Sequence, residues 1–447
     1  MKKQIRHMEL HPAKTLAIGF AGMILIGTLL LSLPMVTQTG RGVGFIDALF
    51  TATSAVCVTG LTTLTTADTW NFWGQLIILI LIQIGGLGIM STATIGVFIT
   101  GARFSLSDRF ALKESMDEVS YSGVIRLAKA ILLLTLLIET LGAIILGVSF
   151  VPRYGLAKGI WMSIFHSISA FCNAGFDIIG AESLKPFQTS GWITLTLASL
   201  VIVGGLGFSV LTDLQQYPRK RSLKLHSRFV LLMTVLLIVF GMIIILGAEY
   251  DNPLTLGPMS LLDKLENAFF QSITPRTAGF SAIDQGNLTS QSQGLTMLLM
   301  FIGGSPGSTA GGIKTVTFGL LIATVISVVR GRDDTEIFHR RISNRLVNRA
   351  IAVMVISLGV IVIPILILVT LNPHLPSSQI MFETMSAYGT VGLSTGITAM
   401  FSEISKFILV ITMFIGRVGP LTVLFALAER ARSKNQLRYP EGRIHIG

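Results

Sequence analysis

Four glycines mark short segments that could bind a cation through backbone oxygens. They lie 104 to 115 residues apart, and a phenylalanine stands ten residues before each, giving the pairs Phe50 and Gly60, Phe165 and Gly175, Phe269 and Gly279, and Phe382 and Gly392. The segments read FTATSAVCVTGL, FHSISAFCNAGF, FQSITPRTAGFS and FETMSAYGTVGL. Glycine accepts backbone angles that a Cβ opposes, and inward-facing carbonyls can replace the water around a dehydrated ion. The repeat therefore predicts a site built from main-chain oxygens.

A second glycine motif recurs in phase with the first. The strings IGGLG, VGGLG, IGGSPG and IGRVG follow the four segments, with their glycines at 85, 86 and 88, at 204, 205 and 207, at 303, 304 and 307, and at 416 and 419. Glycines in membrane helices also serve close packing, which accounts for part of this second set. Packing does not account for the four polar segments, because they are too short to cross a membrane.

The composition is that of a membrane protein. The chain has 447 residues, of which 51% are hydrophobic and 13% charged, whereas soluble domains carry about a quarter charged residues. Apolar runs of near 20 residues, the length that crosses a bilayer, occur throughout, and the first lacks the cleavage site of a signal peptide. The net charge of +11 does not indicate nucleic-acid binding, because the basic residues gather in clusters that flank the apolar hairpins. This pattern predicts cytoplasmic termini and cytoplasmic connecting loops.

Each repeat is predicted to contain a long helix, a short re-entrant helix, the glycine segment and a second long helix. The predicted first helices span 14–35, 124–151, 229–248 and 348–371; the short helices span 45–56, 160–171, 262–274 and 377–388; the second helices span 72–100, 190–212, 294–329 and 404–430. The repeats occupy 1–100, 101–228, 229–345 and 346–447, the last with a C-terminal tail. The fold class is therefore an all-α integral membrane protein with four repeats arranged pseudo-fourfold around one pore.

The third repeat contains an interrupted helix. Five glycines and a proline fall within ten residues, a composition that no regular helix holds: Gly303, Gly304, Ser305, Pro306, Gly307, Ser308, Thr309, Ala310, Gly311 and Gly312. We expect two half-helices joined by a loop at mid-membrane, to which Ser308, Thr309 and Lys314 add hydroxyls and a charge. The stretch also resembles a nucleotide P-loop, but Ile313 puts Lys314 out of register with that motif.

Arg417 is a second feature without a counterpart in the other repeats. It stands where they have Gly86, Gly205 and Gly304. A charge deep in an apolar helix is a functional candidate, and an arginine facing the pore would raise the barrier for cations. The alternative is a structural ion pair with Glu383 or Glu139.

These motifs resemble the Trk/Ktr/HKT superfamily of potassium transporters over nearly the whole chain. The resemblance rests on SAVCVTGLT, SAFCNAGFD, TPRTAGF and GGSPGSTAGGIKT, and the start of the first repeat near Lys14 is similar to KtrB-like membrane subunits. It implies a potassium filter of main-chain carbonyls from Val58, Thr59, Gly60, Asn173, Ala174, Gly175, Thr277, Ala278, Gly279, Thr390, Val391 and Gly392. It also implies that the 303–312 loop is a gate; the alternative from the residues alone is a static kink. In plant members of this superfamily a serine at the first filter position accompanies a preference for sodium. The glycine at this position here, Gly60, therefore favours potassium.

The resemblance further implies the physiological setting. Potassium is the transported ion, bound by the filter carbonyls, and sodium is a coupling or activating ion; no covalently bound cofactor is expected. The expected location is a bacterial plasma membrane, and the expected partners are a second copy in a homodimer and a cytosolic ring of KtrA-like RCK-domain subunits. An uncoupled cation channel stays open as an alternative. An enzyme is not expected, because the chain has no HExxH or GxSxG motif and only seven scattered histidines.

Overall fold

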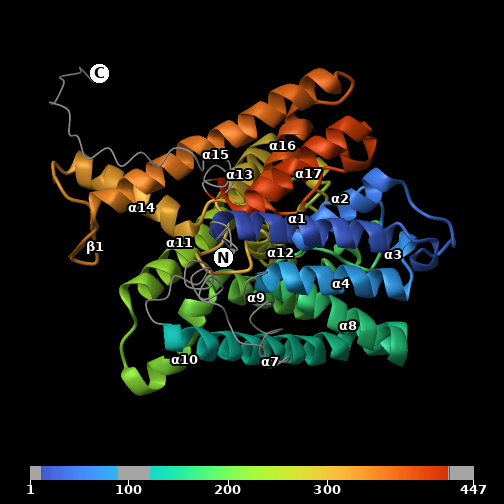
Figure 1. The fold of residues 1–447 in the computed structure, drawn as a ribbon, viewed down its shortest axis with the longest axis horizontal. Coiled ribbons are helices and arrows are strands. Elements are labelled where there is room, and N and C mark those ends of the chain that lie inside the picture. Colours follow the sequence, from blue (N-terminus) through green and yellow to red (C-terminus); the bar gives the residue numbers. More distant parts are fainter. Residues whose placement is uncertain (1–11, 89–120, 421, 423–447) are drawn as a thin grey trace, which may run out of the picture.

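The chain folds into helices that run in several layers (Figure 1). The computed structural model describes residues 12–88, 121–420 and 422. Within these ranges the only sheet is a short antiparallel hairpin that pairs β1 (Glu336–Ile337) with β2 (Arg340–Arg341). The helical architecture confirms the predicted all-α class. In Figure 1, α7 runs along the lower edge and α15 along the upper edge, with α1 and α4 between them.

Every repeat begins with a long helix and a short one. The long helices are α1 (Pro12–Leu31), α7 (Tyr121–Tyr154), α11 (Leu225–Glu249) and α15 (Asn344–Leu371). The short helices are α2 (Phe45–Val56), α8 (Leu156–Phe171), α12 (Leu261–Ile273) and α16 (Ser377–Gly389). All these ends lie within about four residues of their predicted places, the usual error of reading boundaries from sequence.

Within the described residues, each second helix ends or breaks before the end of its predicted range. They are α4 (Phe72–Leu87), α9 (Gly191–Leu206) followed by α10 (Phe208–Lys220), α13 (Ser290–Phe301) followed by α14 (Thr315–Val329), and α17 (Glu403–Val418). The break between α13 and α14 confirms the predicted interruption. The prediction of a continuous helix over 190–212 is wrong, since α9 and α10 meet at 99°. The continuations predicted to 100 and to 430 fall largely outside the described residues.

Three of these breaks share one backbone conformation. Gly88, Gly207 and Gly419 have φ of 83°, 90° and 94° with ψ of 140°, 144° and 134°. This combination of positive φ and extended ψ belongs almost entirely to glycine. The last glycine of IGGLG, VGGLG and IGRVG therefore ends the helix.

The first glycine of the same motif has a packing role. A Cβ added to Gly85, Gly204 or Gly416 would strike the carbonyl oxygen of Val56, Phe171 or Tyr388 respectively. Each of these carbonyls belongs to the residue four before the glycine of the same repeat's segment. Glycine thus lets the second helix lie backbone to backbone against the end of the short helix, as small residues do in membrane proteins generally.

Polar caps and short turns complete the elements. Asn71 begins α4 by accepting the amides of Trp73 and Gly74 at 3.0 and 3.2 Å, and such caps satisfy otherwise unpaired amides. The remaining elements are one-turn helices that connect the longer ones: η1 (Pro34–Val36), α3 (Thr66–Thr69), η2 (Lys185–Phe187), η3 (Gln285–Asn287) and η4 (Thr398–Met400).

The long first helices suit a bilayer. Among the described residues, α1, α7, α11 and α15 are long and apolar enough to cross a membrane, and the bent pair α9–α10 qualifies as a fifth span. Their outer faces expose large apolar side chains, including Leu137, Ile144 and Val148 of α7. The short helices are instead buried toward their carboxyl ends, where every residue from Ala48 to Val56 of α2 is buried.

Candidate functional site

The four segment glycines form a closed ring. Each faces the carbonyl that precedes the glycine of the next segment, so that a Cβ at Gly60 would meet Ala174, one at Gly175 would meet Ala278, one at Gly279 would meet Val391 and one at Gly392 would meet Thr59. At Gly175 the added Cβ would stand 2.6 Å from the Ala278 oxygen. Any side chain at these positions would push into the centre. We call residues 58–60, 173–175, 277–279 and 390–392 the ring segments.

The ring segments share an unusual backbone. The glycines have φ of 89°, 68°, 78° and 95°, and the residues two places earlier are also left-handed: Val58 at 57°, Asn173 at 59°, Thr277 at 70° and Thr390 at 49°. The residue between them does not have positive φ in any segment. Alternating handedness turns successive peptide groups to one side, which is the geometry that a row of coordinating carbonyls needs. Left-handed valine and threonine are strained, and such strain persists only where the surroundings impose it.

A serine near the end of the short helix imposes this conformation. In repeat one, Ser54 accepts the amide of Thr59 on its carbonyl at 2.7 Å and the amide of Gly60 on its hydroxyl at 3.0 Å. In repeat four, Ser386 accepts Val391 and Gly392 in the same way, at 2.9 and 3.0 Å. Because these amides are buried, leaving them unpaired would be costly.

Repeat three uses a threonine in a register shifted by one residue. The carbonyl of Thr274 accepts the Ala278 amide at 2.9 Å, and its hydroxyl donates to the Phe280 carbonyl at 2.6 Å. Of the two phenylalanines in α12, Phe270 is buried at 2% exposure, whereas Phe269 is only partly buried. The predicted alignment on Phe269 is therefore wrong by one place. The sequence signal was a hydroxyl residue four after the phenylalanine, which Phe270 and Thr274 satisfy.

The ring opens onto a single polar pocket of about 540 Å³. All four glycines line it, together with three acidic residues, Asp177, Glu182 and Asp284, and one basic residue, Lys185. Each ring segment closely follows the carboxyl end of a short helix, and this end carries the negative end of the helix dipole. The surroundings of the ring are thus suited to a cation.

The loop between α13 and α14 lies against the ring segments. A Cβ on Gly311 would press into the Thr390 side chain, and one on Gly303 would stand 3.4 Å from the Thr277 methyl. The Thr309 hydroxyl is 3.3 Å from the Asn173 amide oxygen. Segments two, three and four therefore each touch the loop at the residue two before the glycine.

Hydrogen bonds hold this loop in a defined position. Its two ends pair through Gly303, whose amide donates to the Ile313 carbonyl at 2.8 Å. The Ser305 amide donates to the Gly205 carbonyl at 3.0 Å, which ties the loop to the break between α9 and α10. Lys314 turns back on the loop and donates to the Ala310 carbonyl at 2.6 Å, and the Ser308 hydroxyl donates to the Ser305 carbonyl at 2.7 Å. Lys314 and Ser308 thus bond within the loop itself.

Arg417 of the fourth repeat also contacts the loop. Its guanidinium donates to the carbonyls of Thr309 and Gly85 and lies 3.5 Å from that of Gly86. The side chain thereby connects the fourth repeat to the loop of the third and to the second helix of the first. Both acidic partners that the sequence left open are engaged elsewhere.

Those two acids stabilise other parts of the protein. Glu139 accepts the Gln83 amide at 3.0 Å. Glu383 accepts hydrogen bonds from the Thr395 amide and the Thr398 hydroxyl at 2.8 and 2.7 Å. It thereby anchors the loop that follows the fourth ring segment. The structural-ion-pair alternative for Arg417 is therefore not supported by the contacts of either acid.

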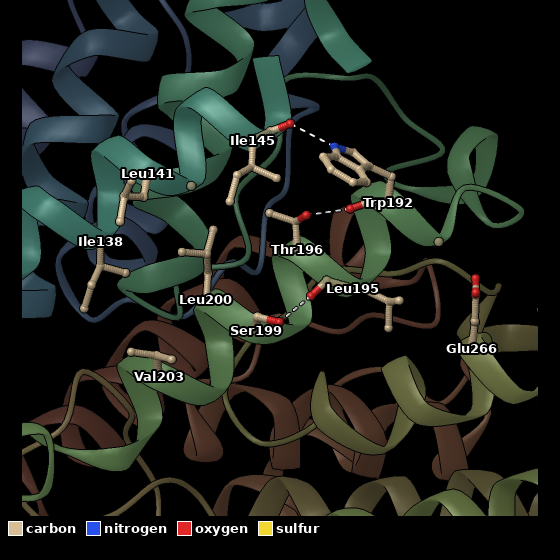
Figure 2. A pocket seen from close by; sticks show the side chains of 12 residues that line it. Ile138, Leu141, Ile145, Trp192, Leu195, Thr196, Ser199, Leu200, Val203 and Glu266 are labelled. Atoms are coloured by element: carbon tan, nitrogen blue, oxygen red, sulfur yellow. Dashed lines mark hydrogen bonds between the residues drawn. The ribbon is translucent and has the colours of Figure 1, made fainter. Parts of the chain in front are cut away.

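A further cavity is lined by none of the ring segments. It has a volume of about 660 Å³ between α7 and α9 and is lined mainly by apolar side chains, among them Ile138, Leu141 and Leu200 (Figure 2). The hydroxyls of Thr196 and Ser199 bond to carbonyls of their own helix at 2.6 and 2.7 Å. The lining is mainly apolar, with Glu266 as its one carboxylate, and it suits an acyl chain better than an ion.

The chain is similar over most of its length to known transport proteins. A family model described as a cation transport protein, TrkH, matches residues 16–438. The potassium/sodium uptake protein NtpJ of Enterococcus hirae is 44% identical, with 100% of this chain and 99% of that protein covered. The Ktr system potassium uptake protein B of Bacillus subtilis is 41% identical, again over 100% of this chain and 99% of that protein. The crystal structure of the potassium transporter TrkH from Vibrio parahaemolyticus has the same fold, with a TM-score of 0.72 at 19% identity over 95% of this chain and 86% of that one.

Proposed function

Because the chain belongs to the TrkH family of cation transport proteins, and is a multi-pass membrane protein of that family, we propose that it is the ion-translocating subunit of a bacterial potassium uptake system. The observation that carries the proposal is the ring of four left-handed glycines, which opens onto one polar pocket. The relatives named as potassium uptake proteins match over their full length, which supports the same substrate here.

In this proposal the ring segments are the selectivity filter. The carbonyls of residues 58–60, 173–175, 277–279 and 390–392 take the place of the water around a potassium ion. The carboxylates of the outer pocket raise the local concentration of cations before they enter. The pore crosses the plasma membrane with both termini in the cytoplasm, as the basic clusters predict.

The 303–312 loop and Arg417 form the gate in this proposal. The loop lies against the second, third and fourth ring segments. Arg417 connects the loop to the second helix of the first repeat. An ion that leaves the filter would meet both, so conduction requires the loop to move. Hydrogen bonds join the loop to the second and fourth repeats, so these bonds must break when the gate opens.

Sodium dependence and partners complete the proposal. The name of the NtpJ relative includes sodium as well as potassium, which supports sodium as a coupling or activating ion. A homodimer, regulated from the cytoplasmic face by RCK-domain subunits, follows from the resemblance to Ktr systems. Crosslinking in native membranes that recovered only monomers would contradict the dimer.

The test is growth rescue of a potassium-uptake-deficient bacterium at low potassium. Wild-type protein should restore growth, and Gly60→Ser should lose potassium selectivity because its Cβ would enter the ring beside Ala174. Unchanged selectivity in Gly60→Ser would refute the filter assignment. Potassium flux into proteoliposomes, with and without a sodium gradient, separates a sodium-coupled carrier from an uncoupled channel.

A further inference from the structure

The cavity between α7 and α9 of the second repeat opens toward the outside of the helical shell (Figure 2). Its volume of about 660 Å³ lies within the range of ordinary ligand pockets, about 300–1,000 Å³. Among the side chains that line it, Leu141 is 50% exposed, Leu195 is 42% exposed and Trp192 is 55% exposed. Because α7 is long and apolar enough to cross a membrane, these side chains face lipid. The cavity is therefore open to the bilayer.

The depth of the cavity matches one leaflet of a membrane. Along α9 its lining extends from Gly191 to Val203, which at ~1.5 Å per residue is about 18 Å, and one leaflet supplies roughly half of the ~30 Å of hydrocarbon. In the predicted topology α9 begins at the outer surface, where Trp192 donates to the Ile145 carbonyl at 2.9 Å, and tryptophan favours that interface. A lining that stops near mid-membrane suits an acyl chain, whereas a helix of a second copy would contact the full thickness.

A carboxylate lies at the outer end of this apolar cavity. Glu266 of α12 lies over the first residue of α9, since a Cβ added to Gly191 would stand 2.5 and 2.6 Å from its two carboxylate oxygens. Figure 2 shows Glu266 at the end of the cavity where Trp192 lies. Within the part of the chain that the structure describes, no hydrogen bond or ion pair engages this carboxylate. An unpaired negative charge beside an apolar cavity, at the depth of lipid headgroups, is complementary to a cationic headgroup.

We propose that this cavity binds a phospholipid of the outer leaflet whose headgroup carries a primary ammonium, as in phosphatidylethanolamine. One acyl chain lies between α7 and α9, and the ammonium, which has three N–H donors, donates charge-assisted hydrogen bonds to Glu266. A phosphatidylglycerol headgroup has no cation to offer this carboxylate. The bound lipid joins α12, the short helix that precedes the third ring segment, to both long helices of the second repeat. This site does not depend on which ion the protein carries.

The headgroup is tested by lipid retention. The full chain is equilibrated in nanodiscs of equal parts phosphatidylethanolamine and phosphatidylglycerol, transferred to mild detergent, and its bound lipids are counted by native mass spectrometry. Wild-type protein should retain phosphatidylethanolamine about fivefold over phosphatidylglycerol, the effect of one net hydrogen bond. Glu266→Gln keeps the shape of the side chain but removes its charge, so the two lipids should be retained equally. Asp251→Asn is the matched control, because that exposed carboxylate lies outside the cavity, and it should keep the wild-type preference.

A second variant tests the place of the acyl chain. Thr196 lines the cavity, and its hydroxyl bonds only to the Trp192 carbonyl of its own helix, so Thr196→Phe fills the cavity without breaking a contact between helices. Each methylene left unburied lowers the affinity about fourfold, so displacing two should lower the retention of both lipids more than about tenfold. Ser199→Phe replaces this variant if it does not fold. Leu137→Phe is the control, since that side chain of α7 is 57% exposed outside the cavity.

The outcomes separate the lipid site from its alternatives. Equal retention of the two lipids by wild-type protein, or an unchanged preference in Glu266→Gln, would overturn the assignment of the headgroup. Full retention in Thr196→Phe would place the lipid elsewhere. Disulfide-linked dimers of Thr196→Cys in native membranes, absent from the wild type, would show that a second copy covers this face and would overturn the site. None of these results bears on potassium flux, which tests the proposed function separately.

Discussion

The guanidinium of Arg417 donates to the carbonyl of Thr309, so that a side chain of the fourth repeat holds the loop of the third. The same guanidinium also donates to the Gly85 carbonyl. A charged donor bonded to two backbone oxygens fixes the loop relative to the first repeat as well. The position that is glycine in the other repeats has become the point where three repeats meet.

Removal of this charged donor should free the loop. Arg417→Ala loses both carbonyl contacts, and a hydrogen bond from a charged group is worth about 2 kcal/mol. We therefore expect the basal potassium flux into proteoliposomes to rise by about 30-fold. Arg417→Lys retains the charge but has no planar guanidinium that can bond to two carbonyls. Its flux should therefore lie between those of the wild-type protein and of Arg417→Ala. Unaltered flux and concentration dependence in Arg417→Ala would exclude Arg417 from the gate.

A methyl group in the ring should block conduction. In Gly279→Ala the new Cβ meets the Val391 carbonyl and lies 3.0 Å from the Gly175 Cα, at a backbone φ of 78° that alanine resists. We expect a loss of potassium flux of more than about 100-fold, since both strain and blockage act on the same site. Gly22→Ala on α1 is the control, because its Cβ meets nothing within 4 Å. Wild-type flux in Gly279→Ala would place the ion path elsewhere.

The break between α9 and α10 should depend on its glycine. Gly207→Ala forces alanine into φ of 90° and puts its Cβ 2.7 Å from the Pro306 carbonyl. A non-glycine residue held at this positive φ with extended ψ costs about 1–3 kcal/mol, so the thermal unfolding midpoint of the detergent-purified protein should fall by several degrees. The matched variant is Gly247→Ala on α11, whose Cβ is unobstructed. Equal midpoints for the two variants would contradict the assigned role of Gly207.

An ion pair joins the first and last repeats. The Lys406 ammonium of α17 lies 2.8 Å from the Asp47 carboxylate of α2, and the side chains are only 13% and 25% exposed. Replacing one partner leaves a poorly solvated charge, so Lys406→Met and Asp47→Asn should each lower the free energy of unfolding by about 1–3 kcal/mol. The double variant should lose less than the sum of the two, because both single changes remove the same interaction. Additive losses, measured by chemical denaturation in detergent, would show that the pair does not stabilise the fold.

Local patterns predicted the elements well. The bounds of α2 match the predicted 45–56, because its apolar and small residues end at a segment that cannot continue a helix. The interruption of the third second-helix was equally legible, since glycine and proline are intrinsically poor in helices. Arg417 stood out for the same kind of reason, as a charge in an apolar helix.

The register of repeat three and the helix breaks were beyond such patterns. Two adjacent phenylalanines, Phe269 and Phe270, fit the spacing to the glycine almost equally, and the burial of Phe270 shows that it is the equivalent residue. The motifs IGGLG and VGGLG contain glycines for close packing and glycines for a left-handed turn, as at Gly204 and Gly207. The sequence does not distinguish a packing glycine from a turn glycine, because the two differ only in backbone angles, which neighbouring helices impose.

The sequence by itself determined that this chain has four repeated membrane segments, each with a glycine where main-chain oxygens can be presented, since hydrophobicity, charge and glycine content act locally. Only the tertiary structure decided what those segments meet. The ring order of the glycines, the carbonyl partners of Arg417 and the contact between Asn173 and Thr277 all join residues more than about 100 positions apart. Such contacts depend on how the repeats pack around one another, and residue type alone carries no record of a distant partner.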